Sequence, residues 1–314
     1  MSTSQEIGKE CGAFESEQPT ITAYPNRETH LGSLQISRAL PIRERRMVGP
    51  WCFLDRFGPV SFSDEKPMNV PPHPHIGLQT VSWLLEGEVL HTDSLDSEAI
   101  VRPGGVNVMT AGHGIAHAEE TPPQNSGRLN GIQLWAALPD QHRETTPSFT
   151  HVAQVPVLEL QGGFAKVFAG TMNDETVQAP YFSEIIGTEL LVHPGQTITI
   201  ELQHPFEHAV LLLEGNGALE KQPLAQNTLH YLGPCRDRLE ITSQTGCKLL
   251  LIGGPPFPSK ILMWWNFVAR SPEEIRQARS DWEAHRRFGE VTGTDLQRLS
   301  SPDLSRFASP NPVS

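Results

Sequence analysis

Residues 72–78 read PHPHIGL and residues 109–119 read MTAGHGIAHAE. Each stretch carries two polar side chains two residues apart, His73 and His75 in the first and His117 and Glu119 in the second. Alternate side chains of a β-strand point to the same face, about 6.6–7 Å apart along the strand. Two such strands, separated by a hairpin and a loop and facing each other in one sheet or barrel, would offer three imidazoles and one carboxylate to a single metal ion.

An accidental pair of histidines is the alternative to a metal site. The chain contains 13 histidines, and Pro74 is also compatible with a loop. The second stretch favours the metal site, because a glycine-rich turn at Gly112 and Gly114 leads into a histidine and a carboxylate at the required spacing. We therefore predict that one metal ion binds to side chains of both stretches.

The pattern of apolar residues predicts an all-β fold. The chain has 26 glycines and 27 prolines, and they recur between short apolar runs. Many short strands separated by turn residues are typical of a β-sandwich or β-barrel. Examples of these runs are residues 81–85, 106–109, 131–135, 196–200 and 248–252.

One segment has the sequence of a helix start. Ser271 is suited to the N-cap, Pro272 to the first helical position and Glu274 to the third, which together form a capping box. Helix-forming residues continue to about Arg287. We expect a short helix here that closes the C-terminal barrel.

Five motifs together resemble the pirin family of the cupin superfamily. They are PHPHIGL (72–78), VSWLLEGE (81–88), HTDS (91–94), MTAGHGIAHAE (109–119) and GIQLW (131–135). The likeness runs from about Arg38 to Glu290. It implies a bicupin, that is, two cupin β-barrels of the double-stranded β-helix type. It also implies one metal ion in the N-terminal barrel, usually iron, with His73, His75, His117 and Glu119 as ligands. Many cupins have a glutamate where this chain has Gln79, and we leave this neutral amide out of the ligand set.

An internal repeat predicts that only the first barrel binds metal. HAVLLLEGNG at residues 208–217 resembles TVSWLLEGE at residues 80–88. The repeat aligns His73 with Glu201, His75 with Gln203 and His117 with Arg238, so the second copy lacks the imidazoles. His204 and His208 would share a face only in a helix, whereas this segment has the pattern of a strand. We expect an N-terminal metal-binding barrel at residues 1–150 and a metal-free C-terminal barrel at 151–314, which includes the helix and tail. The boundary is expected near 145–160.

The charge of the chain argues against nucleic-acid binding. The formal net charge is −12 at pH 7, and phosphates need a basic face. A cluster of four arginines at residues 38–46, Arg38, Arg43, Arg45 and Arg46, is the local exception. We interpret it as a solvated strand edge, where charge discourages aggregation. An anion or partner patch is the alternative.

Other features predict a protein of the reducing cytoplasm. No apolar run reaches the length of a membrane span, and the first residues lack a secretory signal. The cysteines, at positions 11, 52, 235 and 247, form no C-x-x-C pair, which suggests reduced thiols. A disulfide between Cys235 and Cys247 is the alternative. Residues 1–25 and 291–314 are polar and are expected to be loose or draped over the surface.

The ligand set predicts the type of chemistry. Three neutral imidazoles and one carboxylate leave a divalent ion with a net charge of about +1, and an ion that prefers six ligands keeps two positions for substrate and dioxygen. Iron(II) is favoured, with nickel, copper, manganese and zinc as alternatives. The resemblance to pirins implies oxygenation of flavonols, as by quercetin 2,3-dioxygenase. We hypothesise that Glu119 accepts the flavonol hydroxyl proton as a general base. Candidate pocket walls are Phe53, Met68, Trp83 and Met109, for each of which a place in the core is the preferred interpretation.

A second hypothesis is regulatory. Pirin-like proteins are also linked to protein partners and transcription control, in which the redox state of the metal would alter the surface offered to a partner. A roomy metal pocket connected to solvent would favour the enzyme, and a sealed site would favour the regulator. We expect a monomer that uses an aromatic small molecule and dioxygen, with a protein partner under the second hypothesis.

Overall fold

The computed structural model describes residues 21–31, 34–63 and 68–304. Within these residues the chain forms 25 strands and one helix, in agreement with the all-β prediction. It divides into two compact units. The N-terminal unit comprises the described parts of Glu28–Arg38, Cys52–Gln154 and Ser259–Ser314, and the C-terminal unit those of Met1–Arg27, Ala39–Trp51 and Val155–Pro258.

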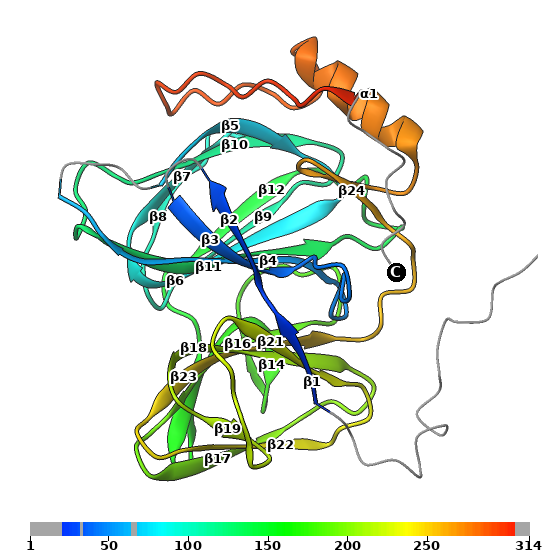
Figure 1. The fold of residues 1–314 in the computed structure, drawn as a ribbon. Helices are drawn as coiled ribbons and strands as arrows, with labels where there is room; N and C mark the ends of the chain where they lie inside the picture. The colour runs from blue at the N-terminus through cyan, green and yellow to red at the C-terminus, as the bar shows by residue number, and fades with distance from the viewer. Residues whose placement is uncertain (1–20, 32–33, 64–67, 305–314) are drawn as a thin grey trace, which may run out of the picture. The chain divides into compact units, whose positions relative to one another are not determined.

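Two sheets form the barrel of the N-terminal unit (Figure 1). The larger has the order β12-β9-β6-β11-β4-β3-β2 and the smaller the order β5-β10-β7-β8. Apolar residues of both sheets, including Ile36, Phe57, Val70 and Leu84, meet in one buried core. The strands of the larger sheet are β2 (Arg27–Leu31), β3 (Leu34–Leu40), β4 (Trp51–Ser61), β6 (Leu78–Gly87), β9 (Val106–Thr110), β11 (Arg128–Ala137) and β12 (Ser148–Val152). Those of the smaller sheet are β5 (Asn69–His75), β7 (Val89–Asp93), β8 (Glu98–Val101) and β10 (Ile115–Glu120).

Two sheets also form the C-terminal unit. The larger has the order β1-β21-β18-β23-β16-β14-β13 with β15 paired to β14, and the smaller the order β17-β22-β19-β20. In β17 the apolar residues Ile198 and Ile200 are buried and alternate with exposed threonines, as one buried sheet face requires. The larger sheet comprises β1 (Thr22–Pro25), β13 (Val157–Leu160), β14 (Gly163–Met172), β15 (Glu175–Thr176), β16 (Ile186–Val192), β18 (Glu207–Gly215), β21 (Thr228–Gly233) and β23 (Cys247–Gly254). The smaller comprises β17 (Gln196–Glu201), β19 (Ala218–Leu219), β20 (Gln222–Pro223) and β22 (Arg238–Ser243).

The helix starts as the sequence predicts. In α1 (Pro272–Glu283) the Ser271 side chain accepts a hydrogen bond from the Glu274 backbone amide, and Pro272 lies in the first turn. The helix ends at Glu283 and not near Arg287, because its backbone gives way to a turn at Ala284 and a positive φ at His285. The strands β24 (Leu262–Trp264) and β25 (Phe267–Ala269) form a hairpin before it.

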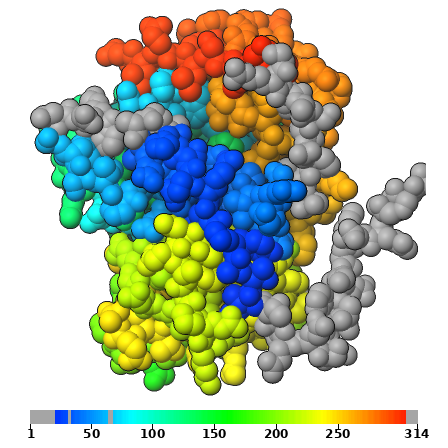
Figure 2. All heavy atoms as spheres, viewed as in Figure 1, coloured from blue at the N-terminus to red at the C-terminus, as the bar shows by residue number. Residues whose placement is uncertain are grey.

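The helix belongs to the N-terminal unit, so the expectation that it closes the C-terminal barrel is wrong. Its apolar stripe, Ile275, Ala278 and Trp282, packs with Ile76 and Ala116 of the N-terminal unit in one buried cluster. Figures 1 and 2 show the orange helix and the red segment after it at the β5 and β10 end of this unit. The units are therefore interleaved in sequence, because residues 259–304 belong to the N-terminal unit and residues 21–27 and 39–51 to the C-terminal unit. The predicted division into two continuous domains, 1–150 and 151–314, is wrong for these segments.

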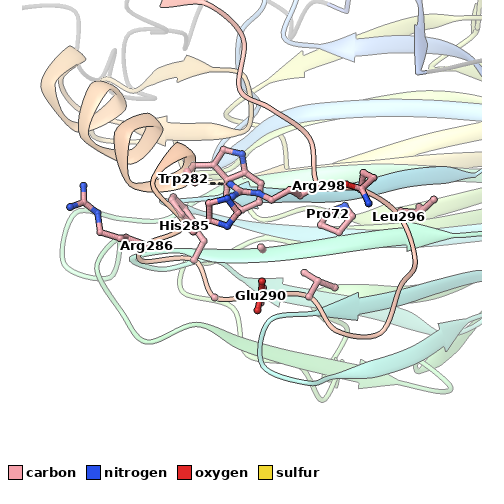
Figure 3. Close-up of a pocket in the computed structure, with 12 residues that line it drawn as sticks. Pro72, Trp282, His285, Arg286, Glu290, Leu296 and Arg298 are labelled. Atoms are coloured by element: carbon pink, nitrogen blue, oxygen red, sulfur yellow. Dashed lines mark hydrogen bonds between the residues drawn. The ribbon is translucent and has the colours of Figure 1, made fainter.

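The segment after the helix and the sheet enclose a cavity of about 570 Å³. Ala116 of β10 and Trp282 of α1 contribute to its walls, and the Arg298 guanidinium carbon lies 3.6 Å from the centre of the Trp282 ring (Figure 3). The backbone amide of Leu299 donates to the Pro72 carbonyl at 2.9 Å. Residues 291–304 are thus draped over the surface as expected. The same expectation is wrong for Thr22–Pro25, which form β1 and pair with β21, and residues 1–20 and 305–314 lie outside the described part.

Two further expectations concern cysteines and membranes. Cys52 and Cys247 are buried free thiols, which excludes the Cys235–Cys247 pairing. Cys235 is disulfide-bonded, so the expectation of a reduced thiol is wrong for that residue, and Cys11 lies outside the described residues. No helix in the described part of the chain is long and apolar enough to cross a membrane.

Candidate metal centre

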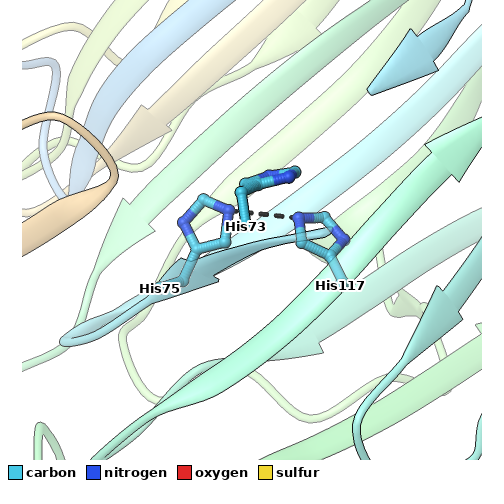
Figure 4. A group of neighbouring side chains, drawn as sticks. All are labelled: His73, His75 and His117. Carbon is cyan, nitrogen blue, oxygen red and sulfur yellow. Dashed lines mark hydrogen bonds between the residues drawn. The ribbon is translucent and has the colours of Figure 1, made fainter. Parts of the chain in front are cut away.

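Strands β5 and β10 bring three histidines together. The two strands pair antiparallel, with His73 directly opposite His117 and Ile115 opposite His75. His73 and His75 point to the same face of β5, and Figure 4 shows the three rings gathered around one point. One ligand nitrogen from each ring lies within 4.8 Å of the others. All three residues are buried.

Backbone carbonyls orient two of the rings. Nδ1 of His73 lies 2.8 Å from the Pro71 carbonyl oxygen, and Nδ1 of His75 lies 3.1 Å from that of Asn266. A carbonyl only accepts hydrogen bonds, so we assign the ring proton of each neutral histidine to Nδ1. Nε2 of each then carries a free lone pair. Nε2 of His75 lies 3.1 Å from Nε2 of His117.

Burial keeps the three rings neutral. It lowers the pKa of His73 to about 4. It also holds the pKa values of His75 and His117 well below their usual range, and the neighbouring histidines add to the effect. Neutral imidazoles are the form that binds metal ions. Three buried imidazoles with their Nε2 lone pairs close together fit a divalent metal ion.

Glu119 lies beside this group. The pairing of β10 with β5 shifts register between His117 and Glu119. Burial raises the pKa of the Glu119 carboxyl, and its Oε1 lies 3.3 Å from the Ser82 hydroxyl. Within the described residues the group that could hold a metal consists of the three histidines without Glu119. Its role as fourth ligand stays a prediction.

A cavity of about 330 Å³ opens onto the three histidines and Glu119. This volume falls in the range of small-molecule sites. Of the four candidate wall residues, Phe53 and Met68 line this cavity, whereas Trp83 and Met109 are fully buried core residues. Trp135, which the sequence did not single out as a wall, stacks on Phe53 with ring centres 4.0 Å apart.

An ion pair also lines this cavity. The Arg38 guanidinium donates two hydrogen bonds to the Asp55 carboxylate, at 2.7 and 2.6 Å, and lies 4.6 Å from the centre of the Phe53 ring. The interpretation of Arg38 as a solvated strand edge is therefore wrong. Strand β3 lies between β4 and β2, so Arg38 faces a partner on β4.

The internal repeat is visible in the strand register. Glu201 of β17 lies opposite Arg238 of β22, just as His73 lies opposite His117. Both residues of the second pair are exposed. His204 contacts Asp237 at 2.8 Å and is exposed, whereas His208 is buried in β18. The described residues of the C-terminal unit contain no group of three or more potential metal ligands.

Comparison with known proteins identifies the family. The Pirin profile matches residues 33–136, and the profile of the Pirin C-terminal cupin domain matches residues 187–289. The chain belongs to the pirin family. The resemblance inferred from the five motifs and the bicupin fold are thereby confirmed.

Three similar proteins illustrate the relationship. A Pseudomonas aeruginosa protein named "Putative quercetin 2,3-dioxygenase" is 42% identical over 274 residues, which are 87% of this chain and 87% of the relative. A "Pirin-like protein" of Caulobacter vibrioides is 36% identical over 267 residues, 83% of this pirin and 92% of the relative. A crystal structure of quercetin 2,3-dioxygenase from Acinetobacter baumannii superimposes with a TM-score of 0.89 and 38% sequence identity. The match covers 94% of this chain and 98% of the Acinetobacter chain.

Sequence reasoning did not single out a fourth buried histidine beside the three in this pirin. His91 of β7 lies opposite Glu119 of β10, and Asp93 lies opposite His117. The His91 ring stacks on Phe149 with centres 4.1 Å apart. The signal was available, because His91 and Asp93 have the same spacing of two residues as the pairs that were recognised.

Proposed function

We propose that this pirin is a metal-dependent dioxygenase that acts on flavonols such as quercetin. The observation that carries the proposal is the convergence of three neutral, buried imidazoles on an open cavity lined by aromatic rings. The names of the Pseudomonas and Acinetobacter relatives support the same activity. An open cavity is also what the enzyme hypothesis requires.

The three histidines would hold one divalent ion, with Glu119 as the fourth ligand. When bound, the ion supplies Lewis acidity and, if it is redox-active, electron transfer with dioxygen. We propose iron(II), with nickel, copper, manganese and zinc as alternatives. The rest of the mechanism concerns the residues of the chain itself.

Aromatic residues would bind and orient the substrate. Phe53 and Trp135 stack with their planes inclined by only 13°. Trp135 and His75 form a T-shaped pair with ring centres 5.2 Å apart. Flat aromatic surfaces suit a flat flavonol, because offset stacking adds to the burial of apolar area. These rings also exclude water from the reacting end of the cavity.

Glu119 would take up the proton of the flavonol 3-hydroxyl. A base is most effective when its pKa lies near the working pH, and burial shifts the pKa of Glu119 upward in that direction. The Ser82 hydroxyl lies 3.3 Å from Oε1 of Glu119 and 2.9 Å from Oε1 of Gln133. Its single proton can be donated to either oxygen, and turned to Glu119 it would hold the carboxylate in place. We further propose that the protein works as a cytoplasmic monomer, without direct contact to nucleic acid or membrane.

Oxygen consumption tests the proposal. Protein loaded separately with iron(II), nickel(II) and copper(II) is supplied with quercetin under air, and oxygen uptake and loss of the quercetin absorbance are followed together. We expect equal molar uptake of oxygen and quercetin, and no turnover by His75→Ala under the same loading. Fully metallated wild-type protein that consumes no oxygen with any of the three metals would contradict the proposal.

A negative result would favour the regulatory function. Its sequence support was the arginine cluster from Arg43 to Arg46. One member is engaged, since the Arg45 guanidinium carbon lies 3.7 Å from the centre of the Tyr231 ring. The cluster therefore does not present three free cations to a partner.

A further inference from the structure

We propose that Asp93 and His91 are positioning residues that fix His117 in the tautomer whose Nε2 lone pair faces the metal. The inference rests on the metal site of the proposed function and adds residues outside the ligand set. Neither residue needs to touch the metal or the substrate. Their role is to determine which nitrogen of His117 carries the proton.

The three side chains form a chain of contacts inside the barrel. Oδ2 of Asp93 lies 3.0 Å from Nε2 of His91, and Nδ1 of His91 lies 3.3 Å from Nδ1 of His117. The antiparallel pairing of β7 with β10 builds this arrangement, because it places Asp93 opposite His117. Asp93 is 1% exposed, His91 3% and His117 1%, so water does not compete for these contacts.

The direction of the hydrogen bonds follows from Asp93. Its other oxygen, Oδ1, accepts from the backbone amides of Leu95 and Ser97 at 2.8 and 3.1 Å. An ionised carboxylate only accepts, so the proton between Asp93 and His91 lies on Nε2 of His91.

The remaining contact then fixes His117. When the His91 ring carries a single proton, held at Nε2 by Asp93, its Nδ1 has no proton and must accept. Nδ1 of His117 must therefore donate, because two lone pairs facing each other at 3.3 Å would repel. The proton of His117 lies on Nδ1, and its Nε2 lone pair points towards Nε2 of His75, 3.1 Å away. These two lone pairs also repel each other. Moving the His117 proton to Nε2 would relieve that repulsion only by turning a lone pair of His91 towards the charged Asp93 carboxylate, which costs more because it gives up a charge-assisted hydrogen bond. A cation held between the two Nε2 atoms relieves the repulsion instead.

The substitution Asp93→Asn should reverse every step. The Leu95 and Ser97 amides still need an acceptor, so the amide oxygen takes the place of Oδ1 and the amide NH₂ turns to His91. Nε2 of His91 must then accept, and its proton moves to Nδ1. Nδ1 of His117 must accept in turn, and its proton moves to Nε2, where it blocks the metal. A carboxylate-to-amide change imposes the wrong histidine tautomer in serine proteases by the same logic.

Two readouts test the inference, and neither requires quercetin. The first is long-range nitrogen NMR of the metal-free protein with labelled histidines at pH 8, which reports the tautomer of His117. The second is the affinity for Zn²⁺, used as a diamagnetic probe in competition with a chelator. Loss of a hydrogen-bonding partner behind a metal ligand typically costs about 10–100-fold in affinity.

We expect His117 to carry its proton on Nδ1 in the wild type and on Nε2 in Asp93→Asn, with about 10–100-fold weaker Zn²⁺ binding in the variant. The matched control is Asp96→Asn, which removes the same charge from an exposed position three residues away and should leave the affinity within about twofold. His91→Phe keeps a ring on Phe149 and removes the relay, so it should weaken binding even if Asp93→Asn fails to fold.

Two results would overturn the inference. One is a wild-type His117 protonated on Nε2 at pH 8, and the other is wild-type Zn²⁺ affinity in whichever of Asp93→Asn and His91→Phe folds. A protein that shows the expected tautomer and Zn²⁺ affinity but no quercetin turnover would refute the dioxygenase proposal alone.

Discussion

Replacing Glu119 with glutamine separates the role of a base from the role of a structural side chain. The substitution keeps the shape of the residue and an oxygen that can accept from the Ser82 hydroxyl. It removes the ability to take up a proton. Burial raises the pKa of this carboxyl, which means that the folded protein tolerates the charge less well than water does. A neutral amide should therefore not lower the thermal midpoint of the metal-free protein.

The expected loss is catalytic. Removal of a general base lowers the rate by about 10²–10⁴-fold, which corresponds to about 3–5 kcal/mol in the barrier. The pH dependence of activity gives an independent test of this role. Wild-type activity should rise with pH through the pKa of Glu119, above the ordinary glutamate range, because only the carboxylate can accept the proton. The variant should lack this rise.

The assay must correct for metal content, because Glu119 is also the proposed fourth ligand. Oxygen uptake with quercetin is measured under saturating substrate and divided by the metal bound in the same sample. Glu120→Gln is the matched control, since it makes the same change one residue away on the other face of β10. Turnover per bound metal within about threefold of wild type in Glu119→Gln would refute the assignment of a general base.

Three further outcomes are expected. His75→Ala should fold with a wild-type circular dichroism spectrum and bind less than a tenth of the wild-type metal by elemental analysis, and full occupancy would count against its role as a ligand. Ile275 is fully buried, so Ile275→Ala should lower the free energy of unfolding by about 2–5 kcal/mol. Amide hydrogen exchange should then increase in β10 before it increases in β18. The reverse order would be incompatible with a helix packed on the N-terminal barrel. Burial and the Arg236 charge lower the pKa of His208 to about 4. His208 is therefore protonated near pH 6.5 in the unfolded chain but only near pH 4 in the folded chain. The free energy of unfolding, measured by denaturant titration, should fall by up to about 3 kcal/mol between pH 7 and 4. It should fall by less in His208→Gln. Equal pH dependence of the two proteins would disprove a contribution of His208.

Spacing alone predicted much of the N-terminal barrel. The period of two in a strand placed His73 and His75 on one face, and the register of β5 with β10 set His117 opposite His73. The capping residues Ser271 and Pro272 likewise located the helix start. These features are local, and the physical rules behind them act over a few residues.

Features that depend on distant partners could not be read in the same way. The helical stripe of Ile275 and Trp282 fits any apolar face of suitable size, so the sequence did not show which barrel it covers. Arg38 looked like a surface charge because its partner Asp55 lies on another strand. The relay behind His117 also escaped notice, since it needs β7 and β10 side by side. The spacing of His91 and Asp93 within β7 shows only that the two side chains share a face, and not that they lie next to His117.

The central claim is that His73, His75 and His117 bind one metal ion through Nε2. Its most direct test is a crystal structure of the iron-loaded protein with data at the iron absorption edge. We expect one anomalous peak per chain, about 2.0–2.2 Å from Nε2 of all three histidines, as is usual for metal–imidazole bonds. A peak elsewhere in the chain, or fully loaded protein with no peak among these three rings, would contradict the account.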